Sequence, residues 1–226
     1  MKQRTPGLQR KWGYIVNSLQ NIIPSYELAS SRISLYADRR MRTEAIGFAV
    51  EKGSMVLDLG AGPGTMSRLV QAKGGRPVLV DVSRPMLGVS DFQDKVQAVF
   101  EYLPFRDGVF DAVVSGFALR DSHDLRVALK QISRVIRTGG RFAFADLGKP
   151  DSALGFLLVG FYLRVVPNIV GLVMVGRSGL RYGSIFDTYV LVLKNSQLSS
   201  MLSRFFGKVE VHATQLGGSV VFKCAK

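Results

Sequence analysis

The sequence is poor in cysteine and histidine, and these two shortages exclude several classes of protein. The single cysteine, Cys224, rules out a disulfide within the chain. The two histidines and the cysteine lie far apart in the sequence, so they predict no zinc or iron cluster. The first residues, MKQRTP, lack the apolar core of a secretory signal. We therefore expect a cytoplasmic protein without a bound metal.

Acidic residues are also scarce, since 17 aspartates and glutamates stand against 30 lysines and arginines, for a formal net charge of +13. Such a surplus attracts nucleic acid or the anionic face of a membrane. The basic residues are dispersed, with modest clusters at 2–11 and 39–42, and they form no long arm. A nucleic-acid partner, a membrane partner and an ordinary basic surface all fit this charge. The sequence does not specify an oligomeric state.

The segment at residues 56–64, VLDLGAGPG, predicts a buried strand, a glycine-rich turn and then a helix. Dinucleotide sites use G-x-G-x-x-G, whereas this chain has G-A-G-P-G. Asp58 precedes the turn, where its carboxylate would repel a pyrophosphate but attract an ammonium, and Pro63 suits the first turn of the helix. Asp81 ends the next apolar run, VLVD. The pattern favours a nucleoside-cofactor site, and the alternative is a tight strand-to-helix turn in another α/β protein.

Strand-like and helix-like segments alternate from Met55 onward, which predicts an α/β protein with a mostly parallel sheet covered on both faces. We expect strands over residues 56–59, 78–82, 96–100, 110–115, 141–146, 208–212 and 219–223, and helices over residues 67–70, 125–137 and 198–206. The glycine pair 139–140 should end the helix over 125–137, and the pair 217–218 should precede a terminal hairpin. The 226 residues fit one domain over 55–226 with a helical extension over 1–54 that closes over the site.

The apolar run at residues 153–175 nearly matches the roughly 20 residues that cross a membrane. Arg164, Pro167 and Asn168 interrupt its centre, where a charge costs about 2.5 to 3.5 kcal/mol. We therefore expect two shorter apolar helices around a Pro-Asn corner, in an insertion over about 152–190. They either form ordinary core or line a hydrophobic substrate pocket and touch a membrane surface.

Several motifs together resemble one family. The glycine turn resembles motif I of the class I S-adenosylmethionine-dependent methyltransferases, and further matches point to the UbiE/COQ5 quinone-biosynthesis C-methyltransferases. These are LPFRDGVFD at 103–111 (family LPF-x-D-x-x-FD), FALRD at 117–121 (FGLRN), RVIRTGGR at 134–141 (RVLKPGGR) and the Lys149-Pro150 pair, with weaker likeness at 26–30, Tyr182 and Thr188. The resemblance implies a Rossmann-like fold, with a mostly parallel seven-stranded sheet, helices on both faces and a terminal antiparallel hairpin.

The resemblance also implies S-adenosylmethionine as the cofactor. In that family the acid of motif I helps to hold the methionine end and the acid after the second strand holds the ribose hydroxyls, roles that map onto Asp58 and Asp81. Val99 replaces an acid that contacts the adenine amine, so the backbone of Phe100 is expected at the base edge and Met86 over the base. The expected cofactor contacts are Asp58, Gly60, Ala61, Gly62, Gly64, Asp81, Val82, Met86, Phe100 and Ser115.

The methyl acceptor implied by the resemblance is a lipophilic quinol or phenol. Loss of the proton of a phenol, which has an ordinary pKa of about 10, makes the ortho carbon nucleophilic. Arg120, at the end of the fourth strand, is expected to stabilise the phenolate, and Asp121 or His123 to act as the base. Alternatively, Arg120 is a structural ion-pair partner of Asp121 or Asp124, and His123 begins the following helix.

Two other functions stay open at this point. The basic charge fits an RNA-modifying methyltransferase, although no N/D-P-P-Y/F motif and no pair of catalytic cysteines is present. The departures around Val99 fit a noncatalytic binding module that keeps the fold.

Overall fold

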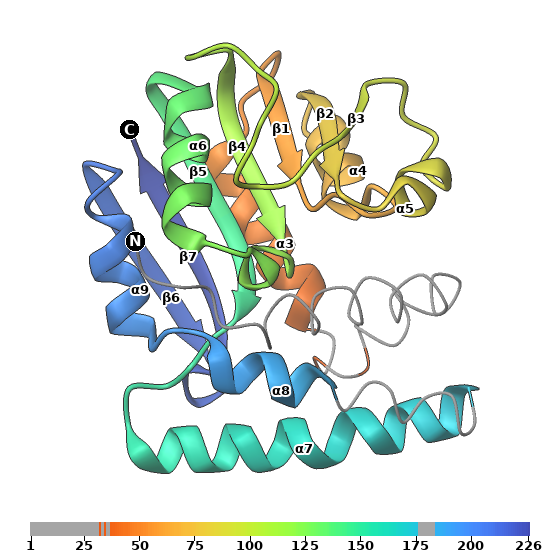
Figure 1. The fold of residues 1–226 in the computed structure, drawn as a ribbon, viewed down its shortest axis with the longest axis vertical. Helices are drawn as coiled ribbons and strands as arrows, with labels where there is room; N and C mark the ends of the chain where they lie inside the picture. Colours follow the sequence, from red (N-terminus) through yellow and green to blue (C-terminus); the bar gives the residue numbers. More distant parts are fainter. Residues whose placement is uncertain (1–31, 33, 35–36, 176–183) are drawn as a thin grey trace.

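A seven-stranded sheet forms the centre of the molecule (Figure 1), a computed structural model that describes residues 32, 34, 37–175 and 184–226. The strands are β1 (Met55–Leu59), β2 (Arg76–Asp81), β3 (Lys95–Gln97), β4 (Phe110–Gly116), β5 (Ile136–Leu147), β6 (Lys208–Thr214) and β7 (Ser219–Ala225), in the spatial order β3-β2-β1-β4-β5-β7-β6. Strands β1 to β5 pair in parallel, while β7 is antiparallel to both β5 and β6. The expected mostly parallel sheet with a terminal antiparallel hairpin is confirmed.

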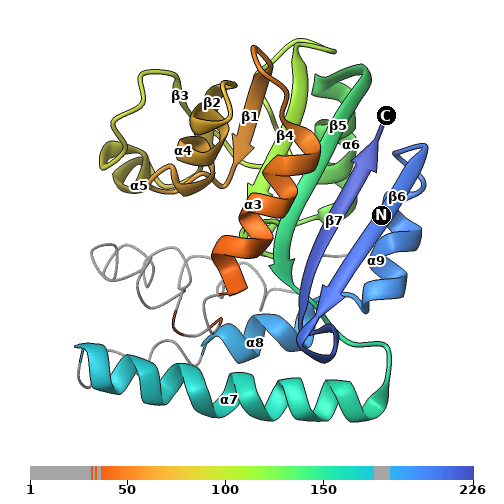
Figure 2. The ribbon, with the colours of Figure 1, turned by 180° about the vertical axis from the view of Figure 1, so that it is seen from behind.

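Helices cover both faces of this sheet, as Figures 1 and 2 show. They are α3 (Ala37–Ala49), α4 (Thr65–Ala72), α5 (Arg84–Gly88), α6 (Leu125–Val135), α7 (Ala153–Val175), α8 (Ser184–Leu191) and α9 (Asn195–Leu202), with short 3-10 turns η1 (Leu119–Asp121) and η3 (Gln215–Gly217). Ala112 and Val114 of β4 pack with α3 and α4, while Val113 packs with the opposite cluster of α6 and α9. Because both faces are buried, the parallel strands have continuous apolar sequences.

Two of the expected element boundaries are wrong, and a third expectation lies mostly outside the described residues. The third strand ends at Gln97, because Val99 instead forms an isolated bridge with Tyr102. The last helix covers Asn195–Leu202 rather than 198–206, since the Gln197 side chain accepts a hydrogen bond of 3.1 Å from the amide of Lys194, the N-cap. The expected helices before residue 32 lie outside the described residues, and α3 is the described helix within the expected extension over 1–54.

The glycine pair 139–140 does not end α6, which stops at Val135 and passes directly into β5. The pair lies in a bulge of β5, where the register with β4 shifts between Phe110 and Ala112. Gly139 has a φ of 77°, and a Cβ on Gly140 would lie 2.7 Å from the carbonyl oxygen of Asp111. Glycine is therefore required by the bulge rather than by a helix end.

Helix α7 is continuous through Pro167, so the expected pair of shorter helices with a Pro-Asn corner is wrong. The polar residues that suggested a corner have partners within α7 and in α8. The Asn168 side-chain amide donates to the carbonyl oxygen of Arg164 at 2.8 Å, and the Arg164 guanidinium lies 5.3 Å from the centre of the Phe186 ring. Pro167 has no backbone N–H, so one hydrogen bond of the helix is lost, at a cost of about 3 kcal/mol in helix stability. The 23-residue helix accommodates this loss.

Helices α7 and α8 lie beyond the carboxyl ends of β4 and β5 (Figures 1 and 2). They pack together through Val159, Leu163 and the fully buried Tyr189. The hydroxyl of Tyr189 donates to the carbonyl oxygen of Phe156 at 3.2 Å. The insertion thus has a small core of its own at the edge of the sheet where ligands of open α/β sheets bind.

Candidate active site

A pocket opens at the carboxyl ends of β1, β2 and β4. Its lining residues are Arg42 from α3, Gly60 to Pro63, Thr65 and Met66 after β1, Asp81 to Ser83 and Met86 after β2, Ala98 to Glu101 after β3, and Gly116 to Ala118 and Asp121 to His123 after β4. Of the expected cofactor contacts, this lining includes Gly60, Ala61, Gly62, Asp81, Val82, Met86 and Phe100. The motifs chosen from the sequence therefore meet at one site, although β1, β2 and β4 are separated along the chain.

The glycine turn packs closely against its neighbours at Gly60 and leaves open space at Gly62, where a Cβ would meet no atom within 4 Å. Gly60 has a φ of 68°, and a Cβ there would overlap Ala118 and lie 3.1 Å from the Phe100 ring. Gly64 has a φ of 88° and is the N-cap of α4, although it does not line the pocket. Because the helix begins at Thr65, Pro63 lies in the turn before the N-cap, and the expectation that it occupies the first helical turn is wrong.

Asp81 joins the turn to the second strand. Its two carboxylate oxygens accept hydrogen bonds of 2.8 Å from the amides of Gly62 and Ser83. Burial raises the pKa of this carboxyl against the lowering effect of the backbone amides. Ser83 also caps α5, which places Met86 at the pocket wall. Asp81 thus lines the pocket in a fixed orientation and keeps further capacity to accept hydrogen bonds, as recognition of ribose hydroxyls requires.

The wall formed by residues 98–101 contains an acid that the motif comparison missed. Val99 is apolar, but Glu101, two residues further on, also lines the pocket. Its Oε1 accepts a hydrogen bond of 2.9 Å from the amide of Asp124, just before α6. The signal in the sequence was an acid displaced by two positions from the family pattern.

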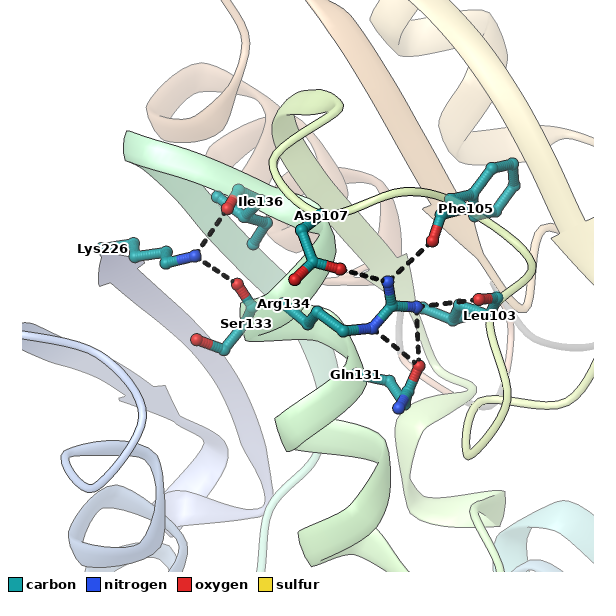
Figure 3. Close-up of polar contacts among 8 residues, drawn as sticks. All are labelled: Leu103, Phe105, Asp107, Gln131, Ser133, Arg134, Ile136 and Lys226. Atoms are coloured by element: carbon teal, nitrogen blue, oxygen red, sulfur yellow. Dashed lines mark hydrogen bonds and ion pairs between the residues drawn. The ribbon is translucent and has the colours of Figure 1, made fainter.

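Arg134 of α6 anchors the loop that follows this wall (Figure 3). Its guanidinium donates to the carbonyl oxygens of Leu103 and Phe105 at 2.9 and 2.7 Å and to the Asp107 carboxylate at 2.7 Å. Gln131 accepts further hydrogen bonds from the same group. One planar fork of donors therefore connects the motifs at 103–111 and 134–141, which explains physically why they occur together.

Asp58 and Ser115 lie beneath the pocket rather than in its lining. Asp58 is fully buried and accepts a hydrogen bond of 2.6 Å from the Ser67 hydroxyl through Oδ2. Its Oδ1 has no hydrogen-bond partner among the described residues, and burial raises its pKa to about 6. The Ser115 hydroxyl donates to the carbonyl oxygen of Leu59 at 2.8 Å, so this side chain joins β4 to β1.

The three expected catalytic residues separate into two groups. Asp121 and His123 line the pocket, whereas Arg120 does not. The Arg120 guanidinium pairs with Asp146 of β5 and lies 3.9 Å from Asp121. Burial raises the pKa of Asp121 to about 6, against the lowering effect of Arg120.

The structure also bears on the alternative roles of Arg120, as an ion-pair partner, and of His123, as the start of a helix. Arg120 does form an ion pair with Asp121, but its principal partner is Asp146 and not Asp124. Asp124 is the N-cap of α6, where it accepts the amide of Val127 at 3.1 Å. His123 therefore precedes the helix rather than beginning it.

Sequence reasoning also missed Arg42 and Phe117, which lie together in the pocket. The Arg42 guanidinium is 4.9 Å from the centre of the Phe117 ring. Phe117 has a φ of 62°, a strained conformation for a residue with a large side chain. Neither position carries a local pattern that marks it as functional, although FALRD contains Phe117.

The order of the sheet and the pocket at its carboxyl edge define a class I S-adenosylmethionine-dependent methyltransferase. Residues 57–144 match the family model described as a methyltransferase domain. The structure is similar to an S-adenosylmethionine-dependent methyltransferase from Thermotoga maritima, described as a possible histamine N-methyltransferase, with a TM-score of 0.63 at 16% identity over 93% of this chain and 99% of that one. At this identity the similarity shows the fold alone.

Sequence relatives narrow the class. The chain is 30% identical to the ubiquinone/menaquinone biosynthesis C-methyltransferase UbiE of Haemophilus ducreyi, over 88% of this chain and 82% of that protein. It is 32% identical to the demethylmenaquinone methyltransferase of Thermus thermophilus, over 71% of this chain and 79% of that protein. The chain belongs to this UbiE family.

S-adenosylmethionine is therefore the cofactor, and the chain is an enzyme rather than a noncatalytic module that keeps the fold. The residues present fit this cofactor. Gly62 leaves open space that a Cβ would fill, Asp81 presents a fixed carboxylate, and an unpaired oxygen of Asp58 lies beneath the pocket.

Proposed function

We propose that this enzyme transfers a methyl group to a ring carbon of a lipophilic quinol or phenol in quinone biosynthesis. The observation that carries the proposal is the similarity, over most of both chains, to proteins named as quinone-biosynthesis C-methyltransferases. The position of Asp121 beside the cofactor pocket supports the chemistry.

When bound, S-adenosylmethionine supplies an electrophilic methyl group on a sulfonium. The chain's own residues must then align the acceptor, exclude water and remove a phenolic proton. S-adenosylhomocysteine would be the leaving group, and the methylated ring carbon would lose its hydrogen as a proton when the ring regains aromaticity. Asp121 is the proposed base, because a carboxyl with a pKa of about 6 is ionised at neutral pH and is a stronger base than an exposed aspartate. His123, which also lines the pocket, is the alternative base.

Arg120 acts through Asp121 in this proposal. Its guanidinium is fixed by Asp146, and its charge lies close enough to stabilise negative charge at Asp121 and at a phenolate beside it. We therefore regard Arg120 as a positioning residue whose effect reaches the acceptor through the field or through a water.

The test is methyl transfer from labelled S-adenosylmethionine to a panel of reduced demethyl-quinols with prenyl tails of different length. We expect one methyl group on a ring carbon, identified by mass spectrometry, and faster turnover with prenylated than with tail-free acceptors. Label in bulk RNA, with none in any quinol, would contradict the proposal and favour an RNA-modifying enzyme.

We further propose a cytoplasmic enzyme that contacts the membrane peripherally through residues 153–175. Leu157, Phe161 and Leu172 of α7 are 67%, 69% and 49% exposed, and the buried stripe of the helix includes the small residues Gly155, Gly160 and Gly171. The segment Ala153–Val173 is the candidate membrane span among the described residues by length and composition, but only 28% of it is buried. An exposed apolar face of this kind fits a lipid surface, where a prenylated acceptor resides.

Co-sedimentation with anionic and neutral vesicles tests the membrane contact. We expect the unaltered enzyme to bind anionic vesicles, because its net charge is +13, and Phe161→Glu to reduce that binding. Val127→Glu is the matched control, since Val127 is 40% exposed on α6. If Phe161→Glu and Val127→Glu bind the vesicles equally well, α7 is not the membrane contact. If salt-sensitive binding to bulk RNA exceeds binding to the vesicles, nucleic acid is the better partner.

A further inference from the structure

Arg42 is a buried cation whose presence the fold alone does not explain. It is 7% exposed and lines the cofactor pocket, where its Nε has no hydrogen-bond partner among the described residues. The buried stripe of α3 carries it inward together with Met41, Ala45 and Ile46. Because an unpaired charge is costly to bury, a guanidinium in this position requires a ligand or a counter-ion.

Two neighbours hold the guanidinium in place without satisfying its donors. The Phe117 ring lies 4.9 Å from Cζ, and a Cβ on Gly116 would lie 3.1 Å from the same atom. Gly116 therefore creates the space that the guanidinium fills, and the aromatic face supports it. Neither neighbour satisfies Nε, one of the donors of the planar fork to which a carboxylate binds best.

Asp58 provides the opposite charge beneath the pocket. Attraction to Arg42 lowers the pKa of Asp58 against the effect of burial, yet no hydrogen bond among the described residues joins the two side chains. The Oδ1 of Asp58 and the Nε of Arg42 thus form a pair of unsatisfied, oppositely charged buried atoms at one end of the site.

S-adenosylmethionine has a matching distribution of charge. With its nucleoside held by Asp81 and the wall over 98–101, as expected from the family resemblance, its amino-acid end would lie toward β1, β4 and α3, where Arg42 lines the pocket. That end carries an α-ammonium and an α-carboxylate. We propose that Arg42 binds the α-carboxylate of the cofactor, with Asp58 as the countercharge that favours the α-ammonium on the same side.

The test compares two ligands that differ at this end. S-adenosylhomocysteine carries the amino-acid group, whereas 5′-methylthioadenosine lacks it. Arg42→Gln should weaken binding of S-adenosylhomocysteine about 10- to 100-fold, the loss of a charge-assisted hydrogen bond, and leave 5′-methylthioadenosine unchanged in calorimetry. Arg42→Lys keeps the charge without the planar fork, so it should recover part of the loss.

Arg40→Gln is the matched control, because Arg40 is an exposed arginine of the same helix. Equal weakening of both ligands by Arg42→Gln would show a purely structural role, and unchanged affinity for S-adenosylhomocysteine would show no contact with the carboxylate. Either result overturns the proposal. If Arg42→Gln does not fold, Arg42→Lys gives the same comparison of ligands. No methyl acceptor is present in these measurements, so their outcome is independent of the proposed quinol.

Discussion

The amide of Gly62 donates a hydrogen bond of 2.8 Å to Oδ2 of Asp81, which fixes the turn after β1 to the end of β2. The acid that is expected to bind the ribose therefore also shapes the glycine turn. A change at Asp81 acts on the cofactor site twice, once through a lost contact and once through a loosened turn.

Asp81→Ala should weaken cofactor binding about 10- to 100-fold or more, because hydrogen bonds to a charged group contribute about 1.5 to 3 kcal/mol each. Calorimetry with S-adenosylhomocysteine measures the effect. Circular dichroism should show an unchanged fold, since the carboxylate lies at the end of its strand. Equal affinity of the variant and the unaltered enzyme would reject the ribose role.

Gly60→Ala should abolish cofactor binding, because a φ of 68° and overlap with Ala118 both oppose a Cβ. Gly47→Ala is the control, since a Cβ there meets no atom within 4 Å and α3 gains about 1 kcal/mol of helix propensity. Retained binding in Gly60→Ala would show that the turn rearranges easily. The measurements are the cofactor affinity of both variants, which tests the role of the turn, and their melting temperatures, which test the fold.

Arg120→Ala should remove methyl transfer while leaving cofactor affinity nearly unchanged, because Arg120 does not line the pocket. It also leaves Asp146, whose side chain is 5% exposed, without its cation, so we expect a loss of about 3 to 5 kcal/mol in the free energy of unfolding. Steady-state kinetics below the melting temperature separate the two effects. Undiminished turnover would remove Arg120 from the mechanism, and Arg126→Ala on the exposed face of α6 is the control.

The pH dependence of activity should contain a limb near pH 6. Asp121 must be ionised to accept a proton, and its pKa is about 6, so kcat/KM should fall as the pH drops through that value. Asp121→Asn should have low activity without this limb, while His123→Gln should retain it. A limb that disappears only in His123→Gln would assign the base to the histidine.

The same carboxyl affects stability with the opposite sign. The pKa of this carboxyl is ordinarily 3.8 and is raised to about 6 in the folded protein. As the pH falls, the folded state therefore binds the proton at a higher pH than the unfolded state does. Asp58 behaves alike, with a pKa of about 6. Both groups therefore contribute stability that is fully present below about pH 4 and is lost as the pH rises from there through 6. As the pH falls from 6 to 4, the free energy of unfolding measured with denaturant should increase less for Asp121→Asn than for the unaltered enzyme.

The parts of the site that the sequence predicts are those encoded by local pattern. The turn after β1 needs glycine at Gly60 because of its torsion angles, and Asp81 ends an apolar strand, so both appear as short motifs. Parallel strands bring their carboxyl ends together, which is why these motifs meet. The order of the sheet followed from the family resemblance rather than from any single motif.

The parts that were missed depend on pairing between distant residues. Asp146 meets Arg120 only because β5 lies beside β4, and Arg42 enters the pocket from a helix before the first strand. The glycine pair 139–140 was assigned to a helix end because glycine fits both a helix end and a bulge, and only the strand register distinguishes them. The continuity of α7 depended on the partners of Arg164 and Asn168, which the apolar pattern does not contain.

Strand β7, the last along this chain, lies inside the sheet between β5 and β6. During synthesis the strands that carry the cofactor pocket are available early, but the edge of β5 stays open until residues 219–225 arrive to pair with residues 141–147. An open edge of apolar sequence is a template for association with other chains. A nascent or shortened chain without β7 is therefore expected to aggregate or to need a chaperone, even though it contains the complete glycine turn.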